Sequence, residues 1–135
     1  MSDLARMTTQ EAVTRNLADL PTQIRLSWPP SLNNMFINVR GRGRVKADAY
    51  TQWRNAAGWE LLSQKAPRFT GPVKVLIELC TPHKRRYDPD NRVKPVMDLL
   101  VEHRVIAGDT DKHIREITVR PVDSGPACTV TVFPA

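Results

Sequence analysis

The chain has 135 residues, of which 41% are hydrophobic, and this length and composition indicate one folded domain and exclude wholesale disorder. Its 20 Lys and Arg against 14 Asp and Glu give a net charge of +6, which favours a polyanionic partner. No window approaches the ~18 apolar residues of a membrane span, and no signal peptide is evident, so we expect a cytoplasmic protein with no membrane partner. Cys80 and Cys128 are expected to be free thiols in a reducing compartment.

Residues 1–22 are predicted to form a helical extension that precedes a domain at residues 23–135. A capping box begins at Thr8, apolar residues follow at helical intervals, and Pro21 ends the predicted helix. The apolar residues of this helix are Val13, Leu17 and Leu20. The extension carries no visible chemistry.

The first half of the domain is predicted to contain a strand, a hairpin and a helix. The strand covers residues 24–28, and the hairpin has arms at residues 35–39 and 44–45 around two glycines. Asp48 is suited to cap the following helix, which ends before Pro67. Residues of this helix expected in the core are Tyr50, Trp53, Ala57, Trp59 and Leu61.

The second half begins with the clearest strand, residues 73–80, in which apolar residues alternate. A polar, basic loop leads into a helix at about residues 92–103, with Pro95 in its first turn because proline lacks a backbone N–H. Two more strands are predicted at residues 116–120 and 127–133. The order β-β-α-β-α-β-β predicts an α+β fold, a single domain with one mixed sheet and two main helices.

Charge is distributed unevenly along the chain. Residues 25–46 carry five bases and no acid, and residues 67–87 carry five bases and one acid, whereas residues 88–135 carry six bases and eight acids. A metal-dependent nuclease needs this combination. Its bases hold the phosphates of the nucleic acid, and its acids hold the cation that promotes attack on one of these phosphates. The bases predicted to contact a nucleic-acid backbone are Arg40, Arg42, Arg44, Lys46, Lys84, Arg85 and Arg86.

The segment with the most evident chemistry contains Asp88 and Asp90, separated by one proline. Carboxylates at i and i+2 in an extended stretch point to the same side, and their repulsion favours a cation between them. Oxygen ligands suit Mg²⁺, with Mn²⁺ as a plausible substitute. Lys94 is placed to neutralise charge on a phosphate. The alternative is two solvated acids, of which Asp90, or the neighbouring Asn91, caps the helix.

Two further acids, Asp109 and Asp111, are candidates for a third ligand, although, taken alone, their pattern favours a simple turn between a helix and a strand. Asp98 lies four residues after Lys94 on one helix face, so it is expected to pair with that lysine and orient it.

The sequence resembles the RusA-type endodeoxyribonucleases, also called crossover or Holliday junction resolvases, over about residues 24–133. One motif is the Trp-Pro-Pro-Ser-Leu-Asn-Asn run at residues 28–34, and the other is the Asp-Pro-Asp-Asn run at residues 88–91 with Lys94, Asp98 and Leu100 after it. The two motifs together, in this order and at this distance, are highly specific.

The resemblance implies a homodimeric enzyme that needs Mg²⁺ and cuts four-way DNA junctions in recombination and repair, and so a protein associated with the nucleoid. It implies that Asp88, Asp90 and Asp109 are catalytic aspartates and metal ligands, with Lys94 as catalytic lysine. It also implies products with 5′-phosphate ends. The family often presents its third aspartate in an Asp-Asp pair, whose first member is Gly108 here, so Asp111 stays a substitute for Asp109.

Three alternatives remain at this point: a non-catalytic nucleic-acid-binding module, a phosphatase for small molecules, and a nuclease with a broader range of branched DNA. The position of Asp109 is also open. Five or so residues connect the end of the second helix to Asp109. Fully extended, they barely span the length of the helix, so Asp109 can only just reach Asp90 of the same chain. A two-fold dimer in which Asp109 of one subunit approaches Asp88 and Asp90 of the other is the easier route.

Overall fold

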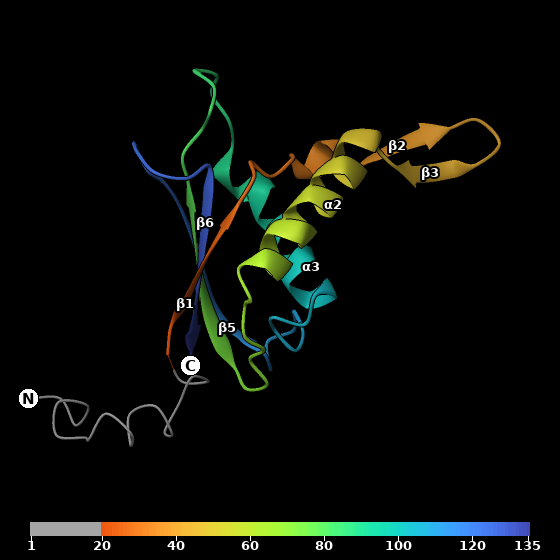
Figure 1. The fold of residues 1–135 in the computed structure, drawn as a ribbon. Helices are drawn as coiled ribbons and strands as arrows, with labels where there is room; N and C mark the ends of the chain where they lie inside the picture. The colour runs from red at the N-terminus through yellow and green to blue at the C-terminus, as the bar shows by residue number, and fades with distance from the viewer. Residues whose placement is uncertain (1–19) are drawn as a thin grey trace, which may run out of the picture.

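The computed structural model describes residues 20–135 (Figure 1). The predicted N-terminal helix therefore lies outside the described residues, apart from Leu20, which is exposed. The strands are β1 (Thr22–Leu26), β2 (Phe36–Val39), β3 (Gly43–Lys46), β4 (Val73–Leu79), β5 (Ile114–Pro121) and β6 (Cys128–Pro134). The helices are the 3₁₀ turns η2 (Leu32–Asn34) and η3 (Pro89–Arg92) and the α-helices α2 (Asp48–Ser63) and α3 (Val93–Glu102).

The main sheet has four strands in the order β1-β6-β4-β5. Strands β1 and β4 both pair antiparallel with β6, whereas β5 pairs parallel with β4. The sheet is therefore mixed, and the predicted α+β fold with two main helices is confirmed. The predicted hairpin does not join this sheet, because β2 and β3 form a separate two-stranded sheet.

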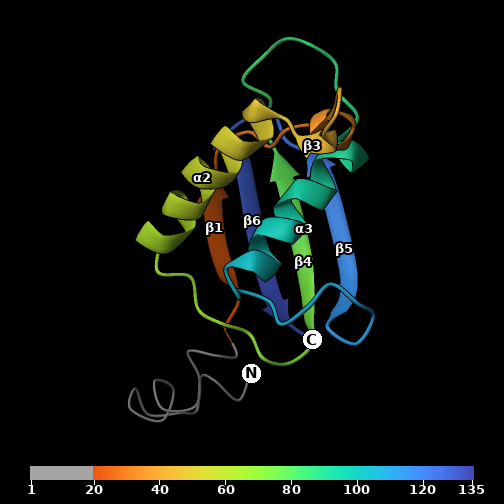
Figure 2. The same cartoon turned by 90° about the vertical axis from the view of Figure 1, so that its right-hand side faces the viewer.

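Helices α2 and α3 lie on one face of the main sheet (Figure 2). Alternation along β4 directs every second side chain toward them, and all four of these residues are buried. They are Val73, Val75, Ile77 and Leu79. Helix α3 contributes Val96, Leu99 and Leu100 to the same core. This packing fixes the start of α3 against the end of the sheet where β4 ends.

Two expectations for α2 were wrong. Its N-cap is Ala47, which makes no side-chain cap hydrogen bond, and Asp48 is the first helical residue, where its charge still complements the helix dipole. Trp59 is 73% exposed, although Trp53 is buried as expected. The stripe through Tyr50, Trp53 and Ala57 is the buried one, and Trp59 lies six residues after Trp53, on a different side of the helix.

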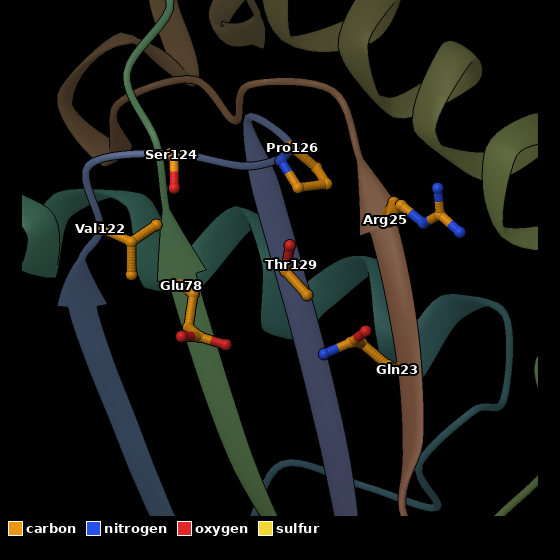
Figure 3. A pocket seen from close by; sticks show the side chains of 7 residues that line it. All are labelled: Gln23, Arg25, Glu78, Val122, Ser124, Pro126 and Thr129. Carbon is orange, nitrogen blue, oxygen red and sulfur yellow. The ribbon is translucent and has the colours of Figure 1, made fainter.

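The face of the main sheet opposite the helices carries a shallow pocket between β1, β6 and β4 (Figure 3). Its residues are Gln23, Arg25, Glu78, Val122, Ser124, Pro126 and Thr129. The single carboxylate in this set, that of Glu78, accepts hydrogen bonds from Arg120 at 3.0 and 3.2 Å, so this pocket does not present free acids. In the described part of the chain, no helix is long and apolar enough to cross a membrane.

Candidate active site

The two aspartates of the Asp-Pro-Asp run lie at the start of the turn that leads into α3. Asp88 is the N-cap of η3 with an extended backbone, and Pro89 occupies the first position of the turn, where its missing N–H costs nothing. Val93 then begins α3, so Pro95 lies in its first turn, as expected. The local sequence therefore determines where the acidic loop ends and the helix begins.

An aromatic and cationic cluster joins this loop to the Trp-Pro-Pro segment that follows β1. The rings of Trp28 and Tyr87 meet edge to face, with centroids 4.8 Å apart. The guanidinium of Arg92 lies over the Trp28 ring, 5.2 Å from its centroid, and its Nη1 donates a hydrogen bond of 2.7 Å to the carbonyl oxygen of Pro29. The two residues that flank the Asp-Pro-Asp-Asn run, Tyr87 and Arg92, are thus in direct contact with the Trp-Pro-Pro motif.

Burial of this cluster has electrostatic consequences. Desolvation lowers the pKa of Arg92 and raises that of Tyr87. The Nε atom of Arg92 and the hydroxyl of Tyr87 are both buried without a hydrogen-bond partner. Burying the Arg92 guanidinium with an unpaired Nε costs free energy. Its contacts with Trp28 and Pro29 offset this cost and hold η3 in place.

Lys94, the second residue of α3, lies between two carboxylates. Its Nζ is 2.9 Å from Oδ1 of Asp98 and 3.6 Å from Oδ2 of Asp109. The hydrogen bond to Asp98 and the charges of both acids raise the pKa of Lys94. The expected pairing of Asp98 with Lys94 is confirmed, and the ammonium keeps its positive charge at neutral pH.

A pocket between α3 and β5 contains the charged residues that the sequence singled out. Asp90, Lys94 and Asp109 line it, together with apolar side chains. The apolar members are Val93, Met97 and Ile117. Asp90 and Asp109 of one chain therefore reach the same pocket without a second subunit, whereas whether a dimer partner also supplies an Asp109 to the site stays a prediction.

The remaining acids stand apart from this pocket. Asp88 accepts a hydrogen bond of 3.4 Å from the side-chain amide of Asn91, and neither residue lines the pocket. Asp111 does not line it either, and its carbonyl oxygen accepts a hydrogen bond from Arg115. Within residues 20–135, no three His, Cys, Asp or Glu side chains are already clustered as a metal site.

The bases predicted to contact a backbone lie on two segments outside the core. Arg40 to Lys46 belong to the β2–β3 hairpin and Lys84 to Arg86 to the loop after β4, and all these basic side chains are exposed. Both segments lie at the end of the main sheet where β4 ends, as Figures 1 and 2 show. This end of the molecule is therefore strongly basic and adjoins η3.

Sequence reasoning missed the role of Arg92. It entered only the count of bases in residues 88–135, whereas it is half-buried and donates a hydrogen bond to Pro29. The available signal was its position directly after the Asp-Pro-Asp-Asn run, which occurs together with the motif that begins at Trp28. Ile117, on the wall of the pocket, carried no sequence signal beyond its membership of a strand.

The sequence matches the family described as endodeoxyribonuclease RusA over residues 27–133. It is 30% identical to the crossover junction endodeoxyribonuclease RusA of Escherichia coli K12 over 109 residues, which cover 81% of this chain and 91% of that protein. The corresponding protein of Enterobacteria phage 82 shows the same identity and coverage. The protein of that name from Aquifex aeolicus is 31% identical over 99 residues, 72% of this chain and 77% of the relative.

The pairing of Lys94 with Asp98 gives a titration that can be tested. Replacing Asp98 by Asn removes the largest cause of the raised pKa, so the pKa of Lys94 should fall, and the ammonium should lose its proton at lower pH than in the wild type. An NMR titration of the Lys94 side chain measures this. The matched control is Glu102→Gln, which removes a carboxylate from the same helix that pairs with Arg54 instead. An unchanged Lys94 pKa in Asp98→Asn would contradict the assignment.

Proposed function

The chain belongs to the RusA family of endodeoxyribonucleases, and on that premise we propose that it resolves four-way DNA junctions by Mg²⁺-dependent hydrolysis of a phosphodiester bond. The observation that carries the proposal is the pocket in which Asp90, Lys94 and Asp109 of one chain meet beside a strongly basic end of the molecule. Relatives named crossover junction endodeoxyribonucleases support the choice of substrate.

The chemistry of the donor set fits a divalent cation. Carboxylate oxygens are the ligands that Mg²⁺ and Mn²⁺ prefer, and the residues that would hold the ion are Asp90 and Asp109, which line the pocket, with Asp88 on the adjoining turn as the further ligand. When bound, the ion activates a water molecule and stabilises charge on the oxygens of the scissile phosphate. Asp90 and Asp109 are both exposed, so the site is open to a polymeric substrate.

The chain's own contribution to the reaction comes from Lys94. Its ammonium stays protonated because the carboxylates of Asp98 and Asp109 stabilise its positive charge, so it acts as a fixed positive charge and hydrogen-bond donor rather than as a base. Directed at a phosphate oxygen or at the leaving oxygen, it stabilises the negative charge that develops there. Asp98 positions this amine without touching the substrate.

Hydrolysis with a metal-activated water leaves a 5′-phosphate and a 3′-hydroxyl, ends that a ligase can join directly. Such products suit an enzyme of DNA recombination and repair, acting in the cytoplasm on nucleoid DNA. We propose that the working form is a homodimer, because a four-way junction has pseudo-two-fold symmetry and a C₂ dimer presents two matched sites to opposing strands.

The decisive experiment compares a synthetic four-way junction with a linear duplex, each with Mg²⁺. The wild type should cut the junction and leave the duplex intact. Equal cleavage of flaps, three-way junctions and four-way junctions would identify a nuclease with broader branched-DNA specificity, and binding without cleavage would identify a non-catalytic module.

Asp90→Asn should abolish junction cleavage while leaving the fold and junction binding intact, because the amide keeps the shape of the side chain and loses affinity for the cation. Cleavage is measured with Mg²⁺, and binding in its absence. Asp111→Asn is the matched control, since Asp111 lies outside the pocket and its loss should leave cleavage near the wild-type rate. Full cleavage by folded Asp90→Asn would refute the metal assignment.

A mixture of Asp90→Asn and Asp109→Asn proteins should stay inactive after subunit exchange. Both residues line one pocket of a single chain, so every site in the heterodimer lacks one carboxylate. Nicking of one strand is measured on a labelled junction, with exchange verified by a tagged subunit. Restored nicking would show instead that Asp109 serves the partner's site.

Alanine in place of Arg40, Arg42 and Arg44 should weaken DNA binding and reduce its salt dependence. Each lost phosphate contact removes roughly 0.9 from the slope of log affinity against log salt on duplex DNA. Binding at a series of salt concentrations measures the slope. An unchanged slope would show that the hairpin does not contact the phosphate backbone.

A further inference from the structure

The β2–β3 hairpin stands apart from the rest of the domain. It forms its own two-stranded sheet and extends away from α2 and the main sheet (Figure 1). One hydrogen bond and one buried residue hold its base: the N–H of Ala47 donates to the carbonyl oxygen of Met35 at 2.9 Å, and the Met35 side chain is buried in the core. The hairpin is thus a projecting ribbon on an anchored base.

The register of the hairpin separates two chemically different faces. Phe36 pairs with Lys46 and Asn38 with Arg44, and these four side chains share one face. Ile37 pairs with Val45 on the opposite face, where Val39 also lies. One face is therefore polar and basic, apart from Phe36, and the other is aliphatic.

The polar face is the one that turns toward the body of the domain at the hairpin's base. Phe36 packs against the core, with its ring 6.2 Å from that of Tyr50, and the Arg44 guanidinium covers the outer side of Phe36 at 4.5 Å. Alternation then directs the aliphatic face away from the core. Ile37 is 51% exposed as a result, and Val39 and Val45 beside it are half-buried, on a ribbon whose solvent side would ordinarily be polar.

Charge on the ribbon identifies the class of partner. Residues 36–46 contain four bases and no acid, so the partner of this element is a polyanion. Gly41 and Gly43 adopt positive φ at the tip, with open space around both, which keeps the tip narrow. A narrow, cationic ribbon that also exposes aliphatic side chains is complementary to nucleic acid at a place where base faces are accessible, because phosphates alone offer no apolar surface.

We propose that the aliphatic face formed by Ile37 and Val45 packs against unstacked base faces at the branch point of a DNA junction, while the neighbouring bases of the ribbon contact its phosphates. This inference rests on the proposed function and deepens it. A continuous duplex presents stacked bases and offers this face nothing to cover. The ribbon therefore selects branched over linear DNA, and Ile37 and Val45 are specificity-determining residues.

The test places Ile37→Thr and Val45→Thr together in the Asp90→Asn background, so that binding is measured without cleavage. Threonine keeps the β-branched shape that strands favour, and it replaces a methyl group of valine or the ethyl group of isoleucine by a hydroxyl. Affinity for a four-way junction should fall about tenfold. Unstacking one base step costs a few kcal/mol, and the variant loses a small part of the apolar contact that offsets this cost. Affinity for a linear duplex of the same sequence should not change.

Two controls make the result specific. Leu62→Thr changes an equally exposed aliphatic residue on α2 and should leave both affinities unchanged. Ile37→Phe enlarges the apolar face and should preserve junction selectivity. A 2-aminopurine placed at the branch point reports unstacking directly, and its fluorescence should rise on binding of the single Asp90→Asn protein and rise less with the threonine double variant.

The outcomes separate this proposal from the proposed function. If the wild type cuts junctions while the Ile37→Thr, Val45→Thr protein keeps full junction selectivity, or loses junction and duplex binding equally, the base-contact proposal is overturned and the nuclease assignment stands. If the threonine variant changes only the oligomeric state seen by light scattering, the aliphatic face is a subunit interface instead. If the wild type fails to cut any junction, the proposed function itself falls.

Discussion

The contact of Arg92 with Trp28 and Pro29 fixes the acidic turn relative to the rest of the domain. On one side of the Trp-Pro-Pro segment, the Trp53 indole of α2 donates a hydrogen bond of 3.0 Å to the carbonyl oxygen of Ser27. On the other side, Arg92 of η3 donates a hydrogen bond to the carbonyl oxygen of Pro29 and lies over the Trp28 ring. A charge-assisted hydrogen bond and a cation–π contact are worth about 1–3 kcal/mol each when partly buried. They connect α2, the segment after β1, and η3 into one unit.

This unit places the carboxylates, and the parallel pairing of β4 with β5 brings the remaining acid to them. After α3, the chain must return to the start of β4 before β5 can run parallel to it, so the connecting residues pass along the side of α3. Asp109 meets Lys94 on this path, in the first turn of the helix and beside Asp90 of the acidic turn. Lys94 consequently bridges the acids of α3 and of the returning loop.

Much of this arrangement was predictable from sequence, for identifiable reasons. Alternation in β4 and the spacing of Tyr50, Trp53 and Ala57 are periodic signals that report burial directly. The approach of Asp109 to Lys94 was not predictable, because it depends on the path of a loop whose length alone permits several routes. Trp59 was predicted to be buried because its residue type was given more weight than its angular position on α2. The half-buried position of Arg92 was not predicted, because a charged residue type ordinarily favours exposure to solvent.

Recognition and chemistry place opposite demands on the chain, and the fold separates them. The residues proposed for catalysis lie on η3, α3 and the adjoining loop, which the core and Arg92 hold in place, and a reactive geometry tolerates little displacement. The bases and the aliphatic face of the hairpin lie outside the core, where substitutions change binding with little cost in stability. A substrate that is bent or branched can therefore be accommodated by the projecting elements while the pocket with Asp90 and Lys94 stays fixed. Under the proposed function, residues such as Ile37 can therefore be substituted to change the preference for DNA shape without disturbing the carboxylates.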